Sequence, residues 1–171
     1  QVKCYNNRGE INAPSKGESY YGQDAQNAGN VMRFKDNEDG TVSDLNTGLM
    51  WVKERGSKVT WDNAMEGASN NRTAGYDDWR VPTIKELYSL IDFSGVNGNN
   101  NMSTEGFIPF IDTDYFDFAY GSGIGSERVI ECQDWSATEY VSTTQDNQPT
   151  VFGVNFADGR IKGYKKFVPP R

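Results

Sequence analysis

Histidine is absent from the sequence, and this absence constrains catalysis more than any motif that is present. Histidine is the commonest general base, a frequent metal ligand and a member of the Ser-His-Asp triad, so most hydrolases lose their usual apparatus without it. Carboxylate pairs for glycoside hydrolysis stay open, because the distance between two acids in space cannot be read from a chain with 24 acidic residues. We therefore do not predict an enzyme, and a carboxylate-based hydrolase is the weakest alternative.

Long apolar runs are absent as well. No window approaches the run of about 20 apolar residues that a membrane span requires. The 17 basic residues are outnumbered by the 24 acidic ones, and a formal net charge of -7 repels polyanions. These features predict no membrane span and no nucleic-acid partner. The chain starts with Gln1 rather than Met, from which we expect a processed, secreted protein.

Cysteine is scarce, with Cys4 and Cys132 as the two present. Their separation excludes a local zinc knuckle and a C-x-x-C redox motif. A structural disulfide between them is the favoured interpretation, and closing so long a loop would stabilise the fold by roughly 4 to 5 kcal/mol in the chain-entropy model. Two unrelated buried thiols are the alternative.

The 171 residues fit one domain, preceded by a polar arm. Residues 1–30 are rich in Gly, Pro and Asn, which predicts an irregular N-terminal arm packed on the domain. A β-hairpin follows, because Asp39-Gly40 is a strong turn signal between residues 33–35 and 41–43. A second turn at residues 46–48 leads into a buried strand at residues 49–51.

Two helices are predicted next. Thr60 is a good N-cap, and Trp61, Ala64, Met65 and Ala68 recur at the spacing of one helical face. Residues 83–86 read as a capping box, with Ile84, Leu87, Tyr88 and Ile91 repeating the apolar spacing behind it.

The remainder predicts a long irregular loop at residues 92–127 and antiparallel strands at residues 128–136 and 151–164, the latter turning at residues 157–159. Helices do not alternate with strands, so the order favours an α+β fold over a βαβ fold. Long loops without periodicity are often binding sites.

Aromatic side chains in or beside the loop are the candidate ligand contacts. For each of them taken alone, burial in the core is the alternative explanation. They are Tyr115, Tyr120, Trp135 and Tyr140.

Clustered acids in the loop are a candidate Ca²⁺ site, since Ca²⁺ takes six to eight oxygen ligands. The three acids are Asp112, Asp114 and Asp117, and their spacing matches no EF-hand. Solvated or helix-capping acids are the alternative.

Five short segments, taken in order, carry a family resemblance: residues 39–44 (DGTVSD), 47–51 (TGLMW), 75–87 (GYDDWRVPTIKEL), 134–138 (DWSAT) and 154–159 (VNFADG). They resemble the C-terminal domain family of the Legionella collagen-like adhesin, the Lcl C-terminal domain. The resemblance implies a single C-type-lectin-like domain at residues 31–171, exported by a bacterium to a secreted, periplasmic or cell-surface location. Similar chains run on into a final strand after Tyr164, so we expect that strand to be missing and the chain to be a fragment.

Three functions remain open from these observations. The first is a surface binding or adhesion module for a glycan or a surface protein, with the loop as its contact. The second is a structural segment of a larger surface protein or assembly. The third, and weakest, is the carboxylate-based hydrolase.

Overall fold

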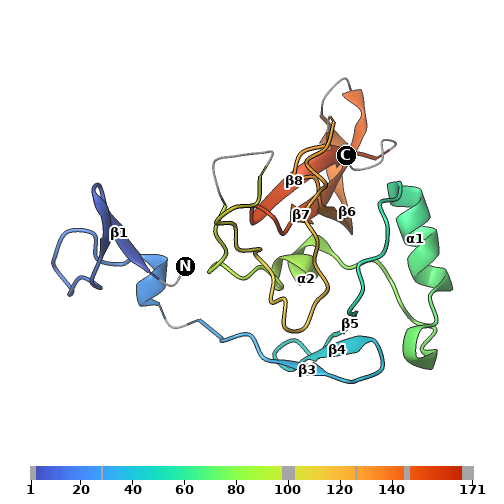
Figure 1. Cartoon of the computed structure of the whole chain (residues 1–171), viewed down its shortest axis with the longest axis horizontal. Helices are drawn as coiled ribbons and strands as arrows, with labels where there is room; N and C mark the ends of the chain where they lie inside the picture. The colour runs from blue at the N-terminus through green and yellow to red at the C-terminus, as the bar shows by residue number, and fades with distance from the viewer. Residues whose placement is uncertain (1–2, 28, 98–102, 126, 145–146, 167–171) are drawn as a thin grey trace.

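The computed structural model describes residues 3–27, 29–97, 103–125, 127–144 and 147–166. Two α-helices and eight strands in three antiparallel sheets make an α+β fold, as predicted. Figure 1 shows the sheet β6-β7-β8 beside both helices, the sheet β3-β4-β5 across from it, and an N-terminal arm to one side. Within the described residues, no helix combines the length and apolar character needed to cross a membrane.

The N-terminal arm is more ordered than its composition predicts. Strands β1 (Cys4–Asn6) and β2 (Gly9–Ile11) form a small hairpin, followed by the 3-10 helix η1 (Asp24–Gln26). The Gln23 amide closes the arm, because its nitrogen donates to the carbonyls of Tyr5 at 2.8 Å and Tyr20 at 2.9 Å. One polar side chain thus replaces the apolar packing that this segment lacks.

The predicted hairpin and the strand after it are confirmed as one sheet. It contains β3 (Phe34–Asp36), β4 (Thr41–Asp44) and β5 (Met50–Val52). Gly40 takes the positive φ of +87° that the turn requires. Thr41 and Val42 are fully buried, so β4 is the strand that anchors this sheet to the core.

Both predicted helices are present with their predicted caps. Helix α1 (Trp61–Asn70) begins after Thr60, whose hydroxyl accepts from the Asn63 amide. The 3-10 helix η2 (Thr73–Gly75) lies between α1 and α2. Helix α2 (Ile84–Tyr88) begins with the Thr83–Glu86 capping box and is only five residues long. Ile91 lies beyond its end, yet is buried where the apolar spacing placed it.

The third sheet corrects one predicted strand. It contains β6 (Gln133–Thr143), β7 (Pro149–Asn155) and β8 (Arg160–Lys165), and the turn at residues 157–159 is confirmed. The strand predicted at residues 128–136 is wrong in its first half. There the Glu131 amide donates to the Arg128 carbonyl at 3.0 Å, which makes a turn, and β6 instead runs on to Thr143.

The main core joins segments that are distant in sequence. Its buried members are Val42, Leu87, Leu90, Ile91, Ile111, Phe116, Val154 and Phe156. Two of them, Ile111 and Phe116, come from the long loop, whose described residues form no helix or strand beyond an isolated bridge between Val96 and Ile108. The loop is irregular, as predicted, but it contributes side chains to the core.

Candidate functional site

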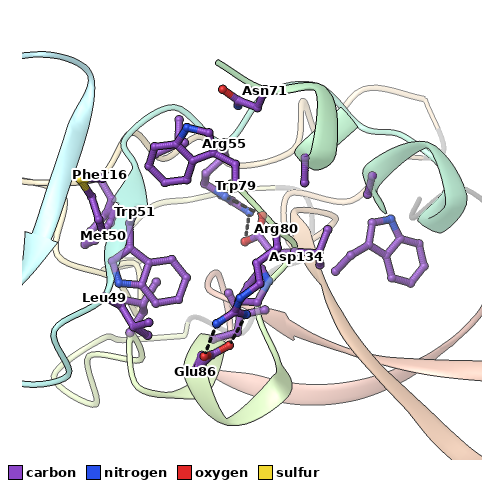
Figure 2. A pocket seen from close by; sticks show the side chains of 18 of the residues that line it. Leu49, Met50, Trp51, Arg55, Asn71, Trp79, Arg80, Glu86, Phe116 and Asp134 are labelled. Carbon is purple, nitrogen blue, oxygen red and sulfur yellow. Dashed lines mark hydrogen bonds and ion pairs between the residues drawn. The ribbon is translucent and has the colours of Figure 1, made fainter. Parts of the chain in front are cut away.

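A cavity of about 570 Å³ lies where the β3-β4-β5 sheet, both helices and β6 meet. Its walls come from the turn before β5, the segment after β5, residues 78–82 and the start of β6. Figure 2 shows the ion pairs Arg55–Asp134 and Arg80–Glu86 in the middle of the lining, with the indoles of Trp51 and Trp79 to their left. Apolar faces and charged groups therefore share one cavity.

The ion pair between Arg55 and Asp134, here called the inner pair, joins residues 79 positions apart. Arg55 donates from Nε to one oxygen of Asp134 at 3.0 Å and from its terminal nitrogen to the other at 2.6 Å. The same nitrogen reaches the Cys132 carbonyl at 2.7 Å, and the guanidinium lies 5.0 Å from the centre of the Phe118 ring. Burial raises the pKa of Asp134, while the Arg55 guanidinium opposes this rise. The pair fixes the loop after β5 against β6.

The ion pair between Arg80 and Glu86, here called the outer pair, is part of the N-terminal cap of helix α2. Arg80 donates to both oxygens of Glu86 at 2.8 and 2.6 Å, while the Thr83 amide and hydroxyl donate to the same carboxylate. The hydrogen bonds from Arg80, with those from Thr83, hold the pKa of Glu86 at about 2. Glu86 thus stays ionised at neutral pH and neutralises Arg80 at the cavity.

Three indoles line the cavity, and they differ in the hydrogen bonds that their ring nitrogens make. Trp135 Nε1 donates to the Val59 carbonyl at 3.0 Å, and Trp79 Nε1 donates to the Thr73 carbonyl at 3.1 Å. Trp51 Nε1 is buried and has no hydrogen-bond partner among the residues that the structure describes. Buried donors without a partner are uncommon in proteins.

A second cavity of about 420 Å³ shares Arg55, Lys58 and Asp134 with the first. Its wall includes the ion pair between Lys58 and Glu127. Hydrogen bonds from Lys58 and Ser122 lower the pKa of Glu127 to about 2. The Lys58 ammonium at the border of the two cavities is therefore neutralised within the chain.

The four predicted ligand aromatics are not brought together. Tyr115 packs on the main core beside Phe34, Tyr120 packs beside Phe107 and Phe118, and Trp135 belongs to a cluster with Trp61. Tyr140 is exposed on β6, with its ring against Phe152. Only Trp135 lines the larger cavity, and Tyr120 lines the smaller one.

The three predicted Ca²⁺ ligands do not converge. Asp112 accepts from the Asp114 amide at 3.1 Å, which makes a local turn, and Asp114 and Asp117 are exposed. In the part of the chain that the structure describes, no three acidic, histidine or cysteine side chains form a group that could hold a metal ion.

The predicted disulfide is not formed, since Cys4 and Cys132 are both free and buried. Cys4 lies in β1 of the arm, whereas the Cys132 thiol contacts the Val129 carbonyl and the Asn155 side chain. Burial raises the pKa of Cys132 to about 11, so its reactive thiolate form is scarce at neutral pH.

Sequence reasoning overlooked the residues that build the larger cavity. Trp79 and Arg80 lie a few residues before the capping box at residues 83–86. Arg55 carries no local signal, because its partner lies in a distant strand. A Trp-Arg pair next to a helix start was the one available hint.

A family model described as the Lcl C-terminal domain matches residues 40–169, which include every segment of the cavity wall. No curated protein and no solved structure matches the chain at a significant level.

Proposed function

The chain belongs to the Lcl C-terminal domain family, and on this premise we propose that it is a surface binding module that holds a glycan in the larger cavity. The family is one of bacterial surface-associated, adhesin-like domains, so the chain fits a surface module in general. Beyond that general assignment, we propose a ligand class, a glycan, and a site, the larger cavity. We also propose that the domain is exported and C-type-lectin-like.

The composition of the cavity is the observation that carries the proposal. Its volume of about 570 Å³ falls within the range of small-ligand sites. Indole faces of Trp51 and Trp79 lie beside the planar ion pairs of Arg55 and Arg80. A sugar ring has an apolar C–H face and a rim of hydroxyls, and it matches such a surface on both counts.

A structural role in a larger surface assembly is the second candidate. The arm exposes three tyrosines, Tyr5, Tyr20 and Tyr21, each with more than two fifths of its surface accessible. Aromatic side chains in this setting are common contacts between protein domains. This role does not need the cavity, so the two candidates can be tested separately.

The test compares Trp79→Ala with Tyr140→Ala. After a glycan array identifies a ligand, isothermal titration should show an affinity at least about tenfold lower for Trp79→Ala and unchanged for Tyr140→Ala. Trp79→Phe, which keeps a ring but loses the bond to Thr73, separates stacking from local unfolding, and a thermal melt of each variant checks the fold. Loss of binding in Tyr140→Ala alone would place the site on β6 instead.

A further inference from the structure

The charged groups around the larger cavity are almost all neutralised within the chain. Its three cations each have a carboxylate partner: Arg55 pairs with Asp134, Arg80 with Glu86, and Lys58 with Glu127. Asp78 is the remaining charged side chain of the wall, and it is exposed and makes no ion pair with any residue that the structure describes. The wall therefore offers no free cation.

An anionic ligand would meet two obstacles here. To become the ion-pair partner of Arg80 it would have to compete with Glu86, which is held by four hydrogen bonds and also caps α2. It would also approach a chain with a net charge of -7. Sulfate or carboxylate groups on a ligand thus find neither an unpaired cation nor a favourable field.

A cationic ligand also gains little binding free energy from the charged groups of the wall. The one unpaired carboxylate, Asp78, is exposed to water, where a single ion pair contributes roughly 0 to 1 kcal/mol. Uncharged hydroxyls, in contrast, need no unpaired charge. They can donate to Asp78 and accept from guanidinium N–H groups that the carboxylates leave unused.

We infer that the cavity selects an uncharged, polyhydroxylated ring, such as a neutral hexose unit, because each cation at its wall is already paired within the chain. This inference rests on the proposed function and narrows it to one class of glycan. It makes Glu86 a specificity-determining residue, since that carboxylate neutralises the most exposed cation of the wall, whose side chain is 57% accessible.

The first experiment measures three classes of oligosaccharide on the wild-type domain: neutral hexose oligomers, heparin-derived oligomers, and glucosamine oligomers. We expect the neutral class to bind at least about tenfold more tightly than either charged class, with little dependence on salt. Tighter binding of a charged class would overturn the inference and leave the proposed function standing. Binding of none of the three would overturn the proposed function itself.

The second experiment uses Glu86→Gln to expose the charge of Arg80. Gln is also a capping-box residue, so α2 keeps its cap. We expect affinity for the heparin-derived probe to rise by about fivefold or more at low salt and to fall again as salt is added. The control is Glu66→Gln, which makes the same change of net charge on an exposed part of α1 outside the cavity. Equal effects of the two variants would overturn the inference.

Discussion

The aromatic side chains of the long loop at residues 92–127 and the tryptophans of the larger cavity differ in burial. In the loop, Phe116 is 4% exposed and lies edge to face with Phe34, and Phe118 packs against Tyr120. At the cavity wall, Trp51 and Trp79 are only half-buried and lie beside charged groups. Phe116 borders the cavity from its core side, whereas the two indoles keep accessible surface at the cavity.

This difference shows what makes a surface available for binding. Irregular backbone does not by itself expose side chains, because a loop anchored at Ile111 and Phe116 is as buried there as a strand. At the cavity wall, the ion pair of Arg55 with Asp134 joins the segment after β5 to β6. The wall combines such charged groups with apolar side chains.

The largest expected effect tests whether the loop belongs to the core. Phe116→Ala should lower the free energy of unfolding by about 3 to 5 kcal/mol, because it empties a buried aromatic position in the main cluster. Chemical denaturation measures the change. Thr113→Ala, at an exposed position of the same loop, should stay within about 0.5 kcal/mol. Similar values for the two variants would mean that the loop is a surface element after all.

The second largest effect tests the ion pair between Arg55 and Asp134 at the cavity wall. Asp134→Asn should cost about 2 to 3 kcal/mol by leaving the Arg55 charge without its partner, somewhat less than for a fully buried pair because the side chains are 20% and 23% exposed. Asp36→Asn is the matched control, since its pair with Lys53 is more exposed and should contribute much less to stability. Equal losses in denaturant titrations would remove the distinction between the inner pair and a surface pair.

The same comparison explains which features the sequence could predict. The Asp39-Gly40 turn, the Thr60 cap and the Thr83–Glu86 capping box depend on neighbouring residues, and all three are confirmed. The start of β6 was misplaced because the turn after Arg128 depends on hydrogen bonds and packing that apolar composition does not reveal.

The candidate site was less predictable for the same physical reason. The aromatics singled out in the sequence belong to three separate clusters and an exposed strand, and the pairing of Cys4 with Cys132 required a proximity that the structure does not provide. Arg55 and Asp134 are 79 positions apart in the sequence and meet only through the tertiary fold. Composition identified the ligand-competent residue types, but only tertiary structure determines which of them share a cavity.

The smallest expected effect concerns the outer pair at acid pH. The pKa of Glu86 is about 2 in the folded protein against an ordinary value of 4.5, so its ionised form stabilises the fold above pH 4.5, and this contribution disappears as the pH falls toward 2. Because Arg80 is largely exposed, we expect only about 1 kcal/mol. Denaturant titrations of wild type and Glu86→Gln should differ by this amount at pH 6 and converge near pH 2. A difference that stays constant with pH would show that Glu86 acts through its shape as a cap and not through its charge.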